Sequence, residues 1–194
     1  IQCVNHSKNG STNMPAKKEN VSQLNSQALK LAANGEYKEA IACFQKAITL
    51  EKNNYRLWYN LGVTYRDTGD LLRAKESLDK AYSIEAEDDQ VIEMLALIDF
   101  NIGLTTEALQ FCHEGLENNC NNSRLWNTLG VIYFNLEKYE NAAEAFEQAI
   151  TIDPYYYDAL FNLRDTYEET GNKVGYKLCD EQLKAIKNFG QINA

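Results

Sequence analysis

Proline is scarce in this sequence, which has only 2 among 194 residues. Proline interrupts a helix because it lacks a backbone N–H and its ring clashes with the preceding turn. Residues that favour helices, such as alanine, leucine, glutamate and lysine, are common instead. This composition predicts an all-α fold.

Histidine is also rare, and the cysteines lack close spacing. The two histidines, His6 and His113, stand in no metal-ligand motif. No CxxC or CxxxC pair occurs among the five cysteines, which are Cys3, Cys43, Cys112, Cys120 and Cys179. We therefore expect reduced thiols in core or surface positions, without a disulfide framework, a metal or a cofactor.

Positive charge is limited to 19 Lys and Arg residues against 28 Asp and Glu, a formal net charge of -9. The basic residues are scattered, which argues against binding to nucleic acid or to an anionic membrane. No apolar run approaches the ~18–20 residues of a membrane helix, so we expect no membrane insertion and a cytoplasmic location. The first residue is Ile1, which leaves an upstream signal or lipidation segment as an alternative.

Sequence motifs of common enzymes are missing as well. No GxSxG, HExxH, Walker or GxGxxG pattern occurs. Two acidic runs remain, Glu87-Asp88-Asp89 and Glu168-Glu169, and we expect them to be solvated charges rather than a catalytic pair. The sequence therefore predicts a protein that is not an enzyme.

What the sequence does contain is an internal repeat. The stretch Arg56–Tyr65 ("RLWYNLGVTY") recurs at Arg124–Tyr133 ("RLWNTLGVIY") with an offset of 68, and Phe44–Leu50 recurs at Phe146–Ile152 with an offset of 102. Both offsets are multiples of 34, which is a period typical of helical arrays. The gap-free windows are 21–54, 55–88, 89–122, 123–156 and 157–190, with residues 1–20 as a tail or helix extension and 191–194 as a second tail.

Each window has the spacing of two helices. In the fourth, Trp126, Leu129, Gly130 and Tyr133 fall at i, i+3, i+4 and i+7, which is one face of a helix. A polar break and a second helical face follow. Small residues recur on the packed faces and allow close helix approach; these are Gly62, Gly130, Ala74, Ala108 and Ala142. Turn positions carry Gly35, Gly69, Gly103 and Gly171, but Glu137 in the fourth window.

These residues resemble the tetratricopeptide repeat (TPR) family. The fourth window matches nearly every signature position, and the second matches through Trp58, Leu61, Gly62 and Tyr65. The third has Asp99 where an aromatic residue is usual. The fifth departs at Arg164, Gly175 and Tyr176, which suits a terminal cap.

The resemblance implies a right-handed superhelical solenoid of about five helix–turn–helix repeats, with the first helices lining a concave groove. Trp58 and Trp126 should wedge between neighbouring units, where truncation to Ala would cost ~3–5 kcal/mol. Function should lie on the groove positions that the repeat leaves free.

The predicted groove combines an apolar strip with a set of asparagines. Asn side chains both donate and accept hydrogen bonds, so they can bracket an extended peptide, while apolar neighbours bury its side chains. The predicted peptide-binding residues are Tyr59, Asn60, Val63, Arg66, Met94, Leu97, Phe100, Asn101, Arg124, Asn127, Val131, Phe134, Asn135, Phe161 and Asn162. The alternative for Val63, Leu97 and Val131 is that they tuck into packing between repeats.

Two known modes of TPR recognition can be compared with these positions. The clamp that holds the C-terminal tail of heat-shock chaperones needs Lys and Asn in one unit and Lys and Arg in a later one. This chain has Asn25, Leu29, Gln90 and Met94 there, so that partner is not expected. The repeat arm of O-GlcNAc transferase uses one Asn per unit, which only Asn60 and Asn162 match; the other three units have Ser26, Met94 and Thr128.

The sequence as a whole predicts a non-enzymatic scaffold that binds a peptide segment of a partner protein in its groove. A regulatory or substrate-recruiting arm of a larger enzyme is the first alternative. Self-association through the groove or the terminal cap is the second.

Overall fold

The computed structural model describes the backbone of residues 20–192 and side chains up to residue 188, and in that part of the chain all regular structure is helical. The helices are α1 (Val21–Ala33), α2 (Tyr37–Leu50), α3 (Tyr55–Asp67), α4 (Leu71–Ile84), α5 (Asp89–Asn101), α6 (Thr105–Asn118), α7 (Ser123–Asn135), α8 (Tyr139–Ile152), α9 (Tyr157–Glu169) and α10 (Lys173–Ile192). The predicted tail before residue 20, with Cys3 and His6, lies outside the described residues.

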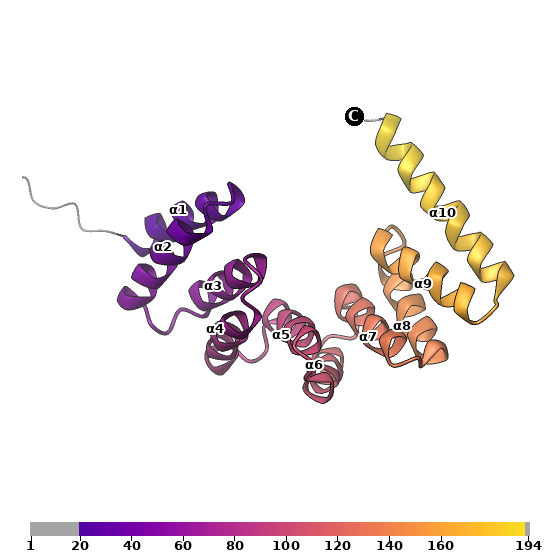
Figure 1. Ribbon diagram of the computed structural model, residues 1–194, viewed down its shortest axis with the longest axis horizontal. Coiled ribbons are helices and arrows are strands. Elements are labelled where there is room, and N and C mark those ends of the chain that lie inside the picture. The colour runs from indigo at the N-terminus through magenta and orange to yellow at the C-terminus, as the bar shows by residue number, and fades with distance from the viewer. Residues whose placement is uncertain (1–19, 193–194) are drawn as a thin grey trace, which may run out of the picture.

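The helices form a solenoid, as predicted. Helix pairs follow one another along an open, curved array with α1 and α10 at its two ends (Figure 1). Odd-numbered helices begin 34 residues apart, at 21, 55, 89, 123 and 157. The backbones of successive odd-numbered helices lie close together, whereas those of successive even-numbered helices do not. Among the even-numbered helices, α4 and α6 still meet through the side chains of Tyr82 and Phe111. This arrangement puts the odd-numbered helices on the inner side of the curve.

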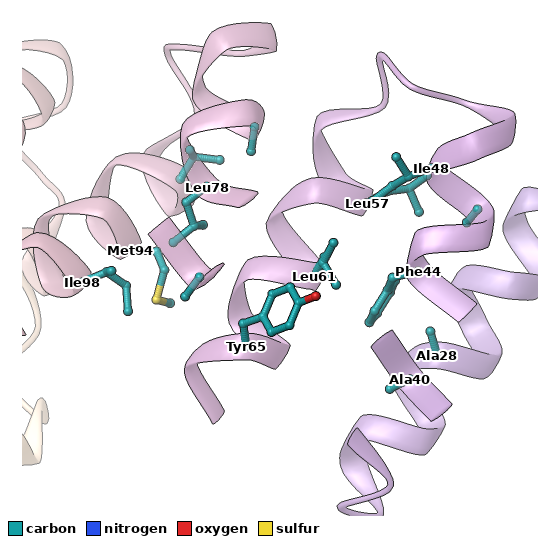
Figure 2. Close-up of a cluster of buried hydrophobic side chains, with 14 of the residues drawn as sticks. Ala28, Ala40, Phe44, Ile48, Leu57, Leu61, Tyr65, Leu78, Met94 and Ile98 are labelled. Carbon is teal, nitrogen blue, oxygen red and sulfur yellow. The ribbon is translucent and has the colours of Figure 1, made fainter. Parts of the chain in front are cut away.

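The core is a row of apolar clusters between consecutive helices. In the first cluster, Phe44 of α2 and Leu78 of α4 are fully buried, and Leu57 and Leu61 of α3 lie between them (Figure 2). Full burial of one such side chain contributes about 1.5–3 kcal/mol. Two further clusters continue this packing from α5 to α8 and from α8 to α10.

Small residues permit this packing at the predicted places. A Cβ on Gly62 would meet Leu78 at 2.8 Å, and one on Gly130 would meet the Phe146 ring at 2.5 Å. The sequence did not single out Gly115, which stands where three other units have Ala and the fifth has Leu183. A Cβ there would collide with Leu125. The absence of a Cβ at Gly115 therefore makes room for the side chains of Leu125 and Ile92.

The turns inside the pairs require left-handed backbone angles. The four predicted turn glycines have φ between 71° and 87°. Glu137 adopts φ 58° at the same place in the fourth pair, which is strained for a residue with a Cβ. The exception seen in the sequence is therefore a strained residue rather than a different turn.

The tryptophans are only partly buried, which corrects the expectation that they are simple core wedges. Trp58 packs against the first cluster and Trp126 against the second. Their indole N–H groups donate to the carbonyl oxygens of Lys52 (2.8 Å) and Cys120 (2.9 Å). Each indole thus binds the loop that precedes its helix. Truncation of the indole should lower the free energy of unfolding by less than removal of a fully buried ring would.

Asp99 replaces the usual aromatic residue with a buried ion pair. Its carboxylate is 0 % exposed, and its Oδ1 and Oδ2 lie 2.9 and 3.1 Å from Lys75 Nζ. Lys75 also reaches Asp79 at 3.2 Å. Burial raises the pKa of Asp99 above its ordinary value, although Lys75 opposes this shift. The pair joins α4 to α5.

Part of the acidic run is structural rather than merely solvated. Asp88 caps α5 by accepting from the backbone N–H groups of Gln90 (3.0 Å) and Val91 (3.1 Å), and it also accepts from the Tyr55 hydroxyl (2.9 Å). Asp89 accepts from the side chain of Asn119, which lies just after α6. These carboxylates therefore connect neighbouring helix pairs.

The thiols of Cys112 and Cys179 are buried in the core, whereas Cys120 is exposed. Burial raises the pKa of Cys112 to about 12, so its thiol stays protonated at neutral pH. Between residues 20 and 192, no helix has both the length and the apolar character needed to cross a membrane.

Candidate functional site

The predicted groove residues lie on the inner helices α3, α5, α7 and α9. They differ in how far their side chains reach solvent. Asn101, Arg124, Asn135 and Phe161 are exposed, and Phe161 reaches 39 %. Ten are partly buried, namely Tyr59, Asn60, Val63, Arg66, Leu97, Phe100, Asn127, Val131, Phe134 and Asn162.

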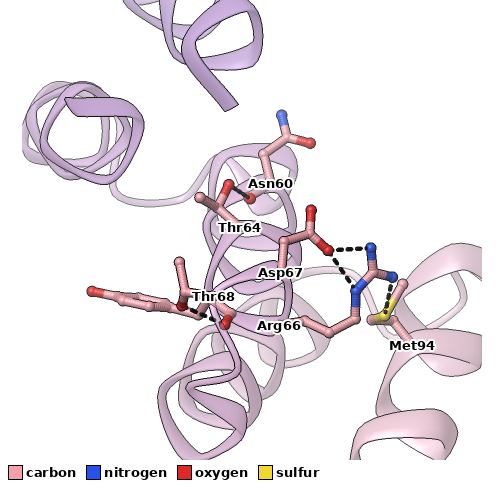
Figure 3. Close-up of polar contacts among 7 residues, drawn as sticks. Asn60, Thr64, Arg66, Asp67, Thr68 and Met94 are labelled. Carbon is pink, nitrogen blue, oxygen red and sulfur yellow. Dashed lines mark hydrogen bonds and ion pairs between the residues drawn. The ribbon is translucent and has the colours of Figure 1, made fainter. Parts of the chain in front are cut away.

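Met94 is the exception and corrects the prediction of an exposed apolar strip. It is 8 % exposed and belongs to the first core cluster. Arg66 donates from Nη1 to the Met94 sulfur at 3.3 Å and from its other nitrogens to Asp67 at 2.7 and 3.0 Å (Figure 3). The Arg66 side chain covers Met94, because both occupy the junction between α3 and α5.

Four asparagines form two matched pairs across neighbouring inner helices. Asn60 Nδ2 donates to Asn25 Oδ1 at 3.0 Å, and Asn162 Nδ2 donates to Asn127 Oδ1 at 3.0 Å. Both pairs have a sequence separation of 35 residues. Asn25 was not among the predicted groove residues, although this shared separation was readable in the sequence.

Each asparagine pair keeps unused hydrogen-bonding capacity. A primary amide has two N–H donors and an oxygen with two lone pairs. In the first pair, the link uses one donor of Asn60 and one acceptor site of Asn25. Asn60 Oδ1 and Asn25 Nδ2 thus stay available to a ligand, and the second pair repeats the arrangement.

A small apolar pocket adjoins the second pair. Its walls are Val131, Phe134, Asn135 and Asn162, together with the core ring of Phe146 and the carboxylate of Asp165. Its volume is ≈ 130 Å³. Cavities of about 150 Å³ in other proteins hold a benzene ring, so this one suits a single side chain. Four of the six lining residues were predicted from the sequence.

Two aromatic side chains of the groove are held by neighbours. Phe134 meets Tyr139 edge to face, with ring centroids 5.4 Å apart. The Arg164 guanidinium lies 4.3 Å from the Phe161 ring centroid and also binds Asp165 at 2.7 Å. Arg164, which departs from the repeat pattern, thereby covers one face of Phe161.

The middle of the groove is polar and carries both signs of charge. Burial raises the pKa of Glu93, and Arg124 and Arg66 oppose the shift. Burial and the nearby Glu93 raise the pKa of Tyr59. Tyr156 has a raised pKa through burial, Asp158 and then Glu93. Glu93 is therefore electrostatically linked to both flanks of the groove, although it was not among the predicted binding residues.

The arrangement offers hydrogen bonds, apolar contacts and charges along the inner helices. Among the described residues, no group of three or more His, Cys, Asp or Glu side chains could hold a metal ion.

Comparison with known proteins gives matches to tetratricopeptide repeat models at residues 123–156 and 55–88 and to a TPR repeat model at residues 28–69. A TPR repeat-containing protein of Methanocaldococcus jannaschii is 28% identical over 148 residues, covering 71% of this chain and 26% of that protein. The BBSome complex member BBS4 of Bos taurus is 29% identical over 126 residues, covering 65% and 24%.

A third relative is the probable UDP-N-acetylglucosamine–peptide N-acetylglucosaminyltransferase SPINDLY of Hordeum vulgare. It is 26% identical over 137 residues, covering 67% of this chain and 14% of that protein. The chain thus spans about a quarter or less of the length of these three relatives.

Solved structures share the fold at low sequence identity. MamA superposes with a TM-score of 0.73 at 22% identity, covering 84% of this chain and 96% of that one. PilF of Pseudomonas aeruginosa gives 0.78 at 16% identity, covering 85% and 75%. YrrB, described as a TPR protein with an unusual peptide-binding site, gives 0.65 at 22% identity and covers 89% of both chains.

The family models match three separate stretches of a chain whose helices begin at a constant 34-residue interval. The inner and outer helices alternate along one solenoid, and MamA and PilF share this fold. The chain belongs to the tetratricopeptide repeat family, whose members are generally non-enzymatic scaffolds for protein interactions.

Proposed function

We propose that this protein is a non-enzymatic scaffold that binds an extended peptide segment of a partner protein in the groove of α3, α5, α7 and α9. The observation that carries the proposal is the repetition of the Asn25–Asn60 pair as Asn127–Asn162. Each pair holds two amides in a defined orientation with donors and acceptors left over. An extended peptide presents the same groups at regular intervals along its backbone.

The pocket beside Asn162 supplies side-chain selectivity. An apolar side chain of the bound peptide would enter between Val131 and Phe134 while its backbone bonds to the amides of Asn127 and Asn162. Burial of apolar surface provides affinity, and the amides set the direction and register of the peptide. The preferred ligand is therefore a segment with an apolar residue flanked by small or polar ones.

The test uses the four exposed groove residues, because their truncation leaves the core intact. We expect Asn101→Ala/Arg124→Ala/Asn135→Ala/Phe161→Ala to lose at least about tenfold in affinity for partner segments captured by the wild type. Loss of a few interface contacts worth ~1.4 kcal/mol together gives that factor. Captured proteins are identified by mass spectrometry, and their segments are titrated by calorimetry.

The matched control carries three exposed changes on the outer helices, Lys38→Ala/Gln110→Ala/Glu140→Ala. Circular dichroism checks that both variants keep the helical fold. Full binding by the groove variant, or equal loss in the control, would overturn the proposal.

The second proposal is that the chain is a substrate-recruiting arm of a larger enzyme. The similarity to SPINDLY, of which this chain covers 14%, favours it. The full open reading frame decides the point, because a catalytic domain encoded beside these repeats is required.

Self-association remains the third proposal, and light scattering tests it. A mass of one chain at every concentration would exclude it. A groove that served only self-association would also capture no foreign segment in the binding assay.

A further inference from the structure

The two copies of the Trp-containing stretch build two equivalent pockets away from the groove. One lies among α6, α7 and α8 and has a volume of ≈ 630 Å³; the other lies among α2, α3 and α4 and has ≈ 650 Å³. Trp126, Leu129 and Tyr133 line the first, and Trp58, Leu61 and Tyr65 line the second at an offset of 68 residues. We call them the Trp126 pocket and the Trp58 pocket.

Neither pocket belongs to the predicted groove. No residue that lines either one is among the fifteen predicted groove residues. On α7, the pocket residues Trp126 and Tyr133 lie on the helical face roughly opposite Asn127 and Val131. These pockets therefore offer a second recognition surface on the same repeats.

The two pockets differ in the charged residues at their rims. Three carboxylates line the Trp126 pocket, those of Glu117, Glu144 and Glu147, and no Lys or Arg does. Two acidic and two basic side chains line the Trp58 pocket, which are Glu76, Asp79, Arg73 and Lys80. Where the Trp58 pocket has Arg73 and Lys80, the Trp126 pocket has Asn141 and Gln148.

In the Trp58 pocket, a basic side chain of the same chain lies against an aromatic ring. The Arg73 guanidinium lies 5.8 Å from the centroid of the Tyr65 ring, as in a cation–π contact. Tyr133 occupies the place of Tyr65 in the Trp126 pocket, and the residue in the place of Arg73 is the neutral Asn141. The Trp58 pocket thus holds a cation of its own chain, whereas the Trp126 pocket has the aromatic wall without the cation.

The carboxylates of the Trp126 pocket form no ion pairs with basic side chains of the described residues. Among the described residues, neither Glu117 nor Glu144 has an ion-pair or hydrogen-bond partner. Glu147 accepts one hydrogen bond from the Tyr167 hydroxyl at 2.6 Å and keeps its second oxygen. All three side chains are exposed. Their spacing does not form a metal-binding group, which favours an organic cation.

We infer that the Trp126 pocket binds an arginine side chain from a basic segment of a partner protein. The flat guanidinium stacks on the indole and phenol rings while its N–H groups bind the surrounding carboxylates. The indole N–H is already bonded to the Cys120 carbonyl, so the ring contributes its π system rather than a hydrogen-bond donor. A net charge of -9 on the chain adds attraction at long range.

The chain contains its own spectroscopic reporters for this test. It has only 2 tryptophans, one in each pocket, so a ¹⁵N–¹H spectrum resolves one indole signal per pocket. The probe is a seven-residue Gly/Ser peptide with one central arginine. The control peptide has citrulline instead, which keeps the shape but is uncharged.

We expect the arginine peptide to shift the Trp126 indole signal saturably and to leave the Trp58 signal unchanged. The citrulline peptide should bind about tenfold more weakly, since a desolvated cation–π contact and its ion pairs supply that factor. Added salt should weaken the arginine peptide further.

Exchanging the basic and neutral residues at the equivalent positions of the two pockets gives a matched pair of variants. Asn141→Arg/Gln148→Lys gives the Trp126 pocket the basic residues of its counterpart and should abolish the shift. The reverse change, Arg73→Asn/Lys80→Gln, leaves Glu76 and Asp79 around Trp58 and should make the Trp58 signal respond. All four positions lie on pocket rims, so circular dichroism should show an unchanged fold.

Three results would overturn the inference. One is an unmoved Trp126 signal, and another is equal binding of the arginine and citrulline peptides. The third is unchanged binding by Asn141→Arg/Gln148→Lys. Binding that survives the four-residue groove variant but fails in the pocket variant separates this site from the groove.

Discussion

At the scale of single residues, backbone strain is concentrated at Glu137. The four equivalent turns use glycine at positive φ, and Glu137 takes the same conformation with φ 58°. A residue with a Cβ in this region costs roughly 1–2 kcal/mol relative to its preferred angles. The neighbouring helices impose the angle, because Lys138 N–H still donates across the turn to Tyr133 at 2.9 Å.

Replacement of Glu137 by glycine should therefore stabilise the protein. We expect Glu137→Gly to raise the free energy of unfolding by about 1 kcal/mol, measured by urea denaturation, after the greater chain entropy of glycine is subtracted. Glu137→Ala is the control because it removes the carboxylate but keeps the Cβ. An equal gain from alanine would assign the effect to charge rather than to backbone strain.

Individual side chains also explain which predicted groove positions are exposed to solvent and which are not. Phe161 and Asn135 reach solvent because their places on the inner helices point away from the neighbouring pair. Met94 does not, since the long Arg66 side chain folds over it. The position of Met94 in the repeat was readable from the sequence, but the path of the Arg66 side chain was not.

At the scale of helices, the Lys75–Asp99 pair is the polar link between α4 and α5. The buried carboxylate is balanced by one ammonium group, that of Lys75, which lies 2.9 Å from Oδ1. A buried charge without its partner is strongly destabilising, whereas a neutral replacement of the pair is often tolerated. The two residues are therefore coupled.

Removal of Lys75 alone should expose this coupling. We expect Lys75→Met to lower the free energy of unfolding by about 3 kcal/mol at neutral pH, and Lys75→Met/Asp99→Asn to recover at least half of the loss. Chemical denaturation of the two single variants and the double variant measures the coupling energy. Additive losses would show that the pair is not coupled.

The same single variant should depend on pH. Burial raises the pKa of Asp99, so the folded protein binds this proton more tightly than the unfolded chain. The stabilising effect of protonation is complete below the ordinary pKa of an aspartate and is lost as pH rises through the raised pKa. Lys75→Met should thus regain stability relative to the wild type as pH falls from neutrality into this window.

The 34-residue spacing of the first helices was the most predictable feature at this scale. Each first helix begins at the first residue of its 34-residue window, because a fixed period of apolar and small residues repeats the same local packing. The capping of α5 by Asp88 was less predictable. The sequence alone made that residue part of a solvated acidic run, whereas the structure gives it three hydrogen bonds.

At the scale of the whole molecule, the solenoid has no contacts between distant repeats. Within residues 20–192, helix backbones lie close only between sequence neighbours and between successive inner helices, and the outer helices α4 and α6 add a side-chain contact between Tyr82 and Phe111. Such arrays behave as a chain of units coupled to their nearest neighbours. Damage in one core cluster should therefore stay local.

Phe146→Ala tests this locality. The ring is 1 % exposed and packs against Gly130 in the third cluster, so its loss should cost about 3–5 kcal/mol there. We expect faster amide hydrogen exchange in α7 to α10 and unchanged protection in α1 to α4, as measured by mass spectrometry. Equal loss of protection at both ends would indicate a single cooperative unit.

The sequence by itself determined the helical class, the 34-residue period, the glycine turns and the small residues at close helix contacts. These features depend on short-range geometry, in which 3.6 residues per turn and the size of each side chain decide the outcome. Only the tertiary structure decided that asparagines pair across repeats, that Lys75 meets Asp99, and that one Trp pocket holds a cation while its copy is ringed by carboxylates. Those outcomes depend on which side chains from different repeats meet, and the curvature of the solenoid brings them together.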